Sequence, residues 1–387
     1  MKLYKVVMKE FRYIFSQKRI GLLLFGVPFS FSVLFGLIYS TEIVKSIPTV
    51  IYDQAQSGAS RSLVQDFADS QRFRIVGVVN TQEEMEQYII NEEAIVAVGI
   101  PFDFSKQIKL GHGGEVVLEI NATNIMYSNT VMTFGREIIT SYNAGVGQKL
   151  VEGVNQVPQQ ALHTVAPVIL KQRLLYNPTN SYTAFLLPGL VANGVQIGII
   201  LCVCTALLRE FGATGLWRTT SPAVIVTGKL LAYWLCSMVA IIMSIAVCIS
   251  AFKIVLRGSM GSLLLICSAF TFMIVNLGLL FSAMARDERM PVHPVMLLYI
   301  MPAFLYSGYN WPHIAKSSFV YAYSLLLPMT YAADTIRDIL LAGYSPDLLL
   351  NSAVLYIAGN VVWTLTIVVC KHRCKSLVAA TSQEVRP

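Results

Sequence analysis

Long stretches without a charged residue alternate along the chain with short charged segments. Six of these charge-free stretches are 22 residues or longer, and a helix needs about 20 mostly apolar residues to cross a bilayer. Because a charge at the bilayer centre costs about 2.5–3.5 kcal/mol on insertion scales, the pattern predicts six membrane spans. The predicted spans lie near residues 20–40, 184–208, 228–252, 259–284, 292–310 and 349–370.

A further charge-free window, 317–333, has only 17 residues and contains Pro328. It is short for a span, so residues 311–345 are expected to form broken helices that re-enter the outer interface. Asp334 and Arg337 are spaced for an ion pair within one helix. The residues singled out in this outer segment are Pro328, Tyr331, Asp334 and Arg337.

Residues 41–180, between the first two spans, follow a different pattern. Short apolar, β-branched runs alternate with segments of helical periodicity, which predicts a small α/β domain with crossover connections. Strands are expected at 47–52, 73–79, 94–100 and 116–121, and helices near 58–70, 81–91 and 126–154. The fold class is therefore an α-helical integral membrane protein with six transmembrane helices and an inserted extracytoplasmic α/β domain.

Composition excludes a wholly soluble protein. Of the 387 residues, 55% are hydrophobic and only 13% are charged, and the mean hydropathy is +0.59. Soluble domains carry about 25% charged residues, so this chain cannot cover a globular surface. A disordered chain is excluded as well, because there is too much apolar surface to bury.

The distribution of charge gives the orientation. Residues 1–20 carry six cations against one acid and the 371–387 tail is also basic, which places both termini in the cytoplasm. Residues 41–180 hold 14 acids and 10 bases, so they are expected outside. Lys253 and Arg257 fit less well, because they fall on the outer side. The net charge of +7 is explained by this orientation signal rather than by nucleic-acid binding.

Residues 1–19 predict a basic amphipathic helix that lies on the inner leaflet before the first span. This segment is the expected elbow helix, and it could also transmit motion into the span. Its apolar face consists of Leu3, Val6, Val7, Phe11, Ile14 and Phe15.

The cytoplasmic loop 208–230 is too short to be a domain, but it presents Phe211, Leu216 and Trp217 at a bend. Exposed aromatic residues at such a place indicate a docking surface for a partner, or interfacial anchoring of Trp217. Lys229 is counted here among the cations of the loop.

Amide side chains are the main polar groups in the spans. They could line a substrate path, although hydrogen bonding between helices is their commoner use. Gly194 and Gly198 form a small-xxx-small pair, which is typical of close helix packing. No acid or base is expected to be buried in the middle of a span, which argues against proton- or sodium-coupled transport. The amides are Asn193, Gln196, Asn276 and Asn360.

The whole arrangement resembles an ABC-2 type permease, the transmembrane subunit of a bacterial ABC exporter, in the subfamily with a large extracytoplasmic domain between helices 1 and 2. The most specific stretch runs from Arg209-Glu210 through Ser221-Pro222 to Gly228-Lys229. An extra Ala213 and the pair Trp217-Arg218 depart from the usual loop. The run 326–331 followed by Arg337 resembles the family's late LLP-x-TY segment.

The resemblance implies export of drugs or other amphipathic molecules across the bacterial inner membrane. It implies ABC ATPase subunits that hold ATP and Mg, a second permease in a homodimer or heterodimer, contact with membrane lipid and in some cases a periplasmic adaptor. This chain would itself bind no cofactor, metal or nucleic acid. The ATPase would dock on a coupling helix formed by Arg209, Glu210, Phe211, Gly212, Thr214, Leu216, Trp217 and Arg218.

Two other functions remain open at this point. A membrane-anchored receptor could act through the extracytoplasmic domain, but it would not need the 209–229 loop. A polytopic enzyme acting on lipids would need clustered acid, base or metal-binding groups. The only candidates for that chemistry are Asp334, Arg337 and Asp338, which are typical of a solvated helix face.

Overall fold

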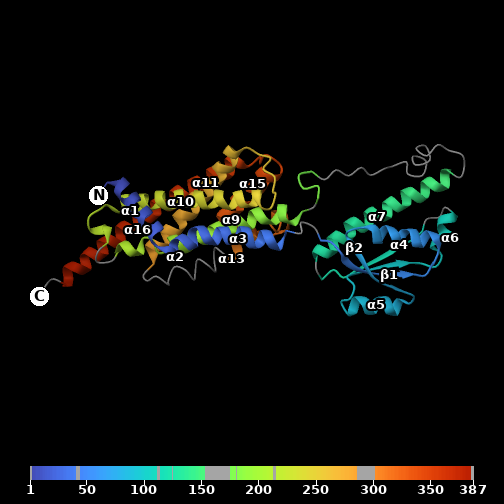
Figure 1. Cartoon of the computed structure of the whole chain (residues 1–387). Helices are drawn as coiled ribbons and strands as arrows, with labels where there is room; N and C mark the ends of the chain where they lie inside the picture. Colours follow the sequence, from blue (N-terminus) through green and yellow to red (C-terminus); the bar gives the residue numbers. More distant parts are fainter. Residues whose placement is uncertain are drawn as a thin grey trace. The chain divides into compact units, whose positions relative to one another are not determined.

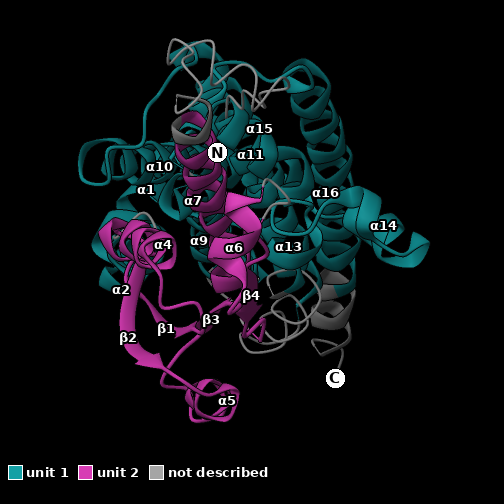
Figure 2. Cartoon of the chain, turned by 90° about the vertical axis from the view of Figure 1, so that its right-hand side faces the viewer, with its two compact units in different colours: residues 1–42, 174–387 teal, residues 43–173 magenta. Residues whose placement is uncertain are grey.

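The computed structural model divides the chain into two compact units, which are described separately (Figure 2). Unit 1 comprises Met1–Glu42 and Leu174–Pro387, and unit 2 comprises Ile43–Arg173. The structure describes residues 2–40, 44–110, 114–123, 125–152, 175–179, 181–211, 215–285 and 301–384.

Unit 1 is helical, and its long helices run side by side (Figure 1). Within the described residues, five helical stretches are long and apolar enough to cross a membrane, and they correspond to the first four predicted spans and the last one. Of the predicted span at 292–310, residues 292–300 lie outside the described residues, and the described remainder forms only the short helix Met301–Tyr306. The stretches are Lys18–Ile38, Tyr182–Phe211, Pro222–Ser250, Met260–Met284 and Leu348–Ser376.

The first of these stretches is built from three consecutive helical segments. A single π-helical turn separates two α-helical parts, and such turns are uncommon and often lie at functional sites. An amphipathic helix, α1 (Leu3–Ser16), precedes them. The three segments are α2 (Lys18–Gly21), η1 (Leu22–Gly26) and α3 (Val27–Ile38).

Helix α9 (Tyr182–Val203) packs against η1 and α3 through two glycines. A Cβ atom on Gly194 would lie 2.6 Å from the Phe31 side chain, and one on Gly198 would lie 2.6 Å from the Leu23 carbonyl oxygen. The structure thus confirms the close packing predicted from the Gly194/Gly198 pair.

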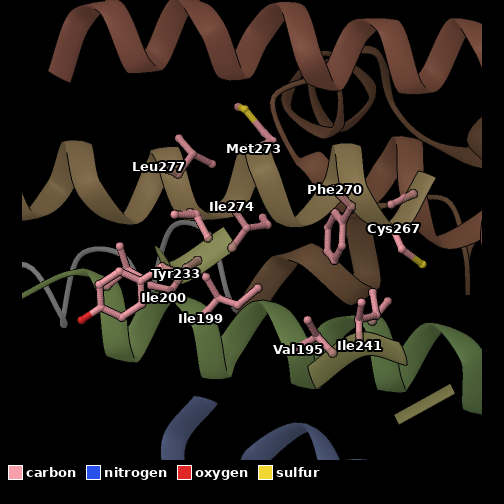
Figure 3. Close-up of a cluster of buried hydrophobic side chains, with 14 of the residues drawn as sticks. Val195, Ile199, Ile200, Tyr233, Ile241, Cys267, Phe270, Met273, Ile274 and Leu277 are labelled. Atoms are coloured by element: carbon pink, nitrogen blue, oxygen red, sulfur yellow. The ribbon is translucent and has the colours of Figure 1, made fainter. Parts of the chain in front are cut away.

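The core of unit 1 lies between α9 and the helices α10 (Pro222–Ser250), α11 (Met260–Met284) and α16 (Leu348–Glu384). Figure 3 shows apolar side chains of α9, α10 and α11 filling this space. The cluster includes Val195, Ile199, Ile200, Tyr233, Ile241, Cys267, Phe270, Met273, Ile274 and Leu277.

Short helices form the described segment between residues 301 and 341. Pro328 stands in the first turn of α15, where its missing N–H leaves no intrahelical bond unmade. None of these helices is long enough to count among the candidate spans. They are α13 (Met301–Tyr306), η5 (His313–Ala315), α14 (Ser318–Ser324) and α15 (Pro328–Leu341).

Unit 2 is a four-stranded sheet with the order β2-β1-β3-β4. The central strand β1 is parallel to both β2 and β3, and β4 is antiparallel to β3, so the predicted crossover connections are present. The strands are β1 (Ile47–Asp53), β2 (Phe73–Val79), β3 (Val96–Ile100) and β4 (Val117–Ile120).

Helices cover both faces of the sheet (Figure 1). Leu63, Phe104 and Tyr142 of three helices pack on one face, and Met85 of α5 packs on the other. The location of this unit outside the membrane stays a prediction. The helices are α4 (Gly58–Asp69), α5 (Gln82–Ile90), α6 (Phe104–Lys109) and α7 (Ile125–Glu152).

We predict that Gly198→Ala lowers the stability of unit 1 by about 1–3 kcal/mol, because the added methyl group would collide with the backbone of η1. The measurement is the thermal unfolding midpoint of the detergent-purified protein. Gly21→Ala is the matched control, since a Cβ there meets nothing within 4 Å. Equal midpoints for the two variants would contradict the packing argument.

Candidate functional site

Helix α1 packs directly against α10. Val6, Glu10 and Ile14 form its buried row, with exposed fractions of 1%, 4% and 0%. Gly228 of α10 makes room for this row, because a Cβ there would lie 2.6 Å from the Val6 side chain. Val6 and Ile14 belong to the expected apolar face of the elbow helix, and the acid Glu10 lies between them in the row that meets the bundle, whereas Phe15 of the same face is exposed.

Two acids and two bases converge where α1 meets α10. The Lys229 ammonium lies 2.6 Å from Glu10 Oε2 and 2.8 Å from Glu210 Oε1. The Arg209 guanidinium lies 2.8 Å from Glu10 Oε1. These four residues, which we call the buried charge cluster, balance each other's charge.

Three of the four side chains are shielded from solvent, and the Arg209 side chain is 25% exposed. The Lys229 side chain is 0% exposed, that of Glu10 5% and that of Glu210 11%. Lys229 is therefore a buried residue of α10, which corrects its assignment to the loop. It is the eighth residue of the 29-residue candidate span Pro222–Ser250, so it lies toward one end of the span and not at its middle. A buried ion pair adds little net stability. Removing one partner leaves the other charge buried and unpaired, which lowers the free energy of unfolding by about 3–5 kcal/mol.

Further contacts fix the two residues that the loop contributes. Arg209 donates to the Tyr233 hydroxyl at 3.2 Å, and its guanidinium stacks 3.6 Å from the centre of the Tyr13 ring. The second oxygen of Glu210 accepts the Leu216 backbone N–H at 3.1 Å. The cluster thus connects α1 and α10 with the loop, through Arg209 and Glu210 before residues 212–214 and through Leu216 after them.

The loop itself forms two short 3₁₀ turns, η2 (Leu208–Phe211) and η3 (Leu216–Arg218). Arg218 is exposed, whereas Leu216 and Trp217 are half-buried. Gly212 and Thr214, two residues of the expected coupling helix, lie outside the described residues. The docking role of the loop therefore stays a prediction.

Arg373 of α16 supports the loop from the other side. It donates to the carbonyl oxygen of Ala283 at 2.8 Å and to that of Ala285, at the C-terminal end of α11. Its guanidinium also lies 4.2 Å from the centre of the Phe211 ring. A cation at a helix C-terminus interacts favourably with the helix dipole.

Sequence reasoning missed Glu10, Lys229 and Arg373 as parts of this site. Glu10 did carry a signal, because it lies four residues after Val6 and four before Ile14, on one helix face. An acid in a buried row needs a cationic partner. Nothing in the sequence alone identifies that partner as Lys229.

The amides expected to line a path lie on three helices, and no hydrogen bond joins any two of them in the described part of the chain. Gln196 is fully buried in α9, and neither of its side-chain polar atoms has a partner among the described residues. The Oδ1 atoms of Asn193 and Asn276 are in the same situation. Asn360 is exposed on α16 and donates to the Tyr356 carbonyl at 2.8 Å. The buried amides can therefore still form hydrogen bonds with polar groups of a bound molecule.

The predicted ion pair in the outer segment is present. Arg337 lies 2.8 Å from Asp334, and its guanidinium is 4.6 Å from the centre of the Tyr309 ring. Tyr331 is separate from this pair, since its hydroxyl donates to the Leu325 carbonyl at 2.9 Å. Burial and the nearby Lys316 ammonium lower the pKa of His313 in the same segment.

Comparison with known proteins agrees with this architecture. The family model described as "ABC-2 family transporter protein" matches residues 19–368. The "Probable multidrug ABC transporter permease YbhR" of Escherichia coli K12 is 23% identical over 355 residues, covering 91% of this chain and 93% of the relative.

Two further relatives match shorter stretches. The E. coli K12 "Probable multidrug ABC transporter permease YbhS" is 26% identical and covers 69% of each chain. The "ABC transporter G family member 20" of Dictyostelium discoideum is 28% identical over 48% of this chain and 26% of its own length. No solved structure gives a significant match.

We predict that Lys229→Met destabilises the protein by about 3–5 kcal/mol, because it leaves Glu10 and Glu210 buried without their shared cation. The thermal unfolding midpoint in detergent is the measurement. Lys5→Met is the control, since Lys5 is an exposed cation on α1.

The double variant Glu10→Gln/Lys229→Met should recover part of this loss, since the two residues interact directly and their effects are not additive. Strictly additive losses would contradict the proposed pairing.

Proposed function

The chain belongs to the ABC-2 transporter family and is a transport permease, and on that premise we propose that it forms the membrane half of an ATP-driven exporter. ATP and Mg are bound by separate ABC ATPase subunits, and this chain contributes no catalytic residue. The observation that carries the proposal is the buried charge cluster, which ties the 208–218 loop to a candidate span.

A force applied to the loop reaches α10 through this cluster. Arg209 and Glu210 extend from the loop, and each is paired with a group on α1 or α10. Because Lys229 contacts both acids, the loop cannot shift relative to α10 without separating buried charges. Loop, elbow helix and α10 therefore move as one body when the ATPase changes state.

The ATPase docks on the exposed side of the loop. Arg209 and Glu210 are engaged inside the protein, so they support the docking surface from beneath rather than form it. Arg218 and Thr219 are exposed on η3 and directly after it, and they are the positions best placed to meet a partner. ATP drives the cycle only if it binds one state of the assembled transporter more tightly than the other.

The exported molecules are drugs or other amphipathic compounds, in line with the printed names of the E. coli relatives. Gln196 and Asn276 are buried amides with unused hydrogen-bonding capacity, which suits a path for molecules that are largely apolar with a few polar groups. Asn360 faces outward from this chain and suits contact with lipid or with a second permease.

The complete transporter contains two permeases, identical or paralogous, in the bacterial inner membrane. Both termini and the 208–218 loop face the cytoplasm, as the distribution of cations indicates. Unit 2 is then extracytoplasmic, and its four-stranded sheet offers a surface for a periplasmic adaptor.

We predict that Arg218→Glu weakens binding of the partner ATPase at least tenfold, since charge reversal at the docking surface opposes a complementary partner. The measurement is recovery of the ATPase with the tagged permease from mild detergent, together with substrate-stimulated ATP hydrolysis.

Arg74→Glu makes the same charge change at an exposed position on β2 of unit 2 and serves as the control. Loss of the ATPase from both variants, or from neither, would contradict docking on this loop.

A further inference from the structure

A pocket of about 220 Å³ opens at the end of unit 1 where α10 ends and α9 begins, the end predicted to face outward. One wall consists of residues 176–179 together with Ser181, Thr183 and Ala184 at the start of α9. The opposite wall is the segment 252–257, which follows α10, and Leu341 of α15 completes the lining. This pocket is separate from the buried charge cluster and takes no part in the function proposed above.

Two cations on one wall determine the charge of the pocket. Lys253 and Arg257 both line it and both are exposed. Neither takes part in any ion pair among the described residues, and no acid lines the pocket. These are the two cations that fit the orientation pattern poorly, because bases are depleted from the outer side of membrane proteins. Binding of an anion in the pocket would explain why both cations lie on this side.

The wall that carries the cations is held firmly in place. Arg257 and Gly258 donate their backbone N–H groups to the carbonyl oxygens of Leu340 and Ile339, each at 3.0 Å. Ile254 is buried, and its N–H bonds to the Cys248 carbonyl at 3.2 Å. A phosphate ligand would therefore meet cations on an ordered backbone, which lowers the entropic cost of binding.

Lys253 adopts a backbone conformation that costs free energy. Its φ of 53° lies in the left-handed region, which residues other than glycine, asparagine and aspartate rarely occupy. Such backbone strain costs about 1–3 kcal/mol and occurs mostly at functional positions. A glycine would relieve it, but a glycine has no ammonium group to present to the pocket.

The opposite wall also suits an anion. Thr179 and Ser181 line it directly before α9, a helix of 22 residues whose N-terminal end carries partial positive charge. Asn177 fixes this turn by bonding to both the N–H and the carbonyl of Ser181, each at 3.0 Å. Cations and a helix N-terminus thus face one small space.

We propose that this pocket binds the phosphate headgroup of an anionic phospholipid. Apolar Phe252 and Val255 lie on the same wall as the cations, and Val255 is 55% exposed. A phosphate ion would use only the charged part of this surface, whereas a lipid places its phosphate on Lys253 and Arg257 and its acyl chains along the apolar side chains. The binding requires neither ATP nor the ATPase.

The test is titration of the full-length protein, purified in neutral detergent, with dioleoyl phosphatidylglycerol, and native mass spectrometry supplies the dissociation constant. Lys253→Gln and Arg257→Gln should each weaken binding about tenfold, through loss of a charge-assisted hydrogen bond. At a lipid concentration close to the wild-type dissociation constant, hydrogen exchange of residues 252–258 should slow in the wild type and should slow much less in either variant.

Lys316→Gln is the matched control. This substitution also removes one lysine charge, but the Lys316 ammonium lies outside the pocket and already donates to the Tyr306 carbonyl at 2.6 Å. Its affinity for phosphatidylglycerol should stay within about twofold of wild type, because nonspecific attraction falls equally in all three variants. Equal affinities in the three variants would overturn the site. Displacement of the lipid by millimolar inorganic phosphate would overturn the lipid assignment in favour of a soluble phosphate ligand.

Discussion

The pairing of the buried Lys229 ammonium with the carboxylates of Glu10 and Glu210 is the interaction on which the end of unit 1 that carries the 208–218 loop depends. Each of these three residues belongs to a different part of the chain. A charge taken out of water is tolerated only when it is paired, so the three parts hold one relative position. Gly228 allows this geometry, since any side chain there would push α1 away from α10.

This constraint gives the permease a physical means of transmitting a change in its partner. Bonds between charged groups fix geometry more than they add stability, and a fixed geometry is what a coupling element needs. The loop's other support is Arg373 of α16, whose guanidinium lies over the Phe211 ring and donates to the end of α11, so side chains of two candidate spans, α10 and α16, contact the loop. The opposite end of the unit has a different electrostatic character, because Lys253 and Arg257 line a pocket there and form no ion pair with any residue that the structure describes.

Much of the fold could be predicted from the sequence, because it follows from local rules. The long charge-free stretches predicted the spans, five of which the structure shows as helices. The alternation of strand-like and helix-like segments in the sequence predicted the α/β unit. Caps are local in the same way: the Thr81 hydroxyl accepts the Glu84 N–H at the start of α5, and the Glu84 side chain accepts the N–H of Asn80. The charge cluster escaped prediction because it joins Glu10 to residues about 200 and more positions away, and no local pattern encodes such a pairing.

The most direct test is a distance measurement by double electron–electron resonance between spin labels at residues 5 and 219, both exposed. The transporter would be assembled with its ATPase and examined with and without ATP. If the elbow helix and the loop move as one body, the distance between these two labels stays constant while the distance between the residue 219 labels of the two permeases changes. A change in the 5–219 distance on ATP binding would contradict rigid coupling through Lys229.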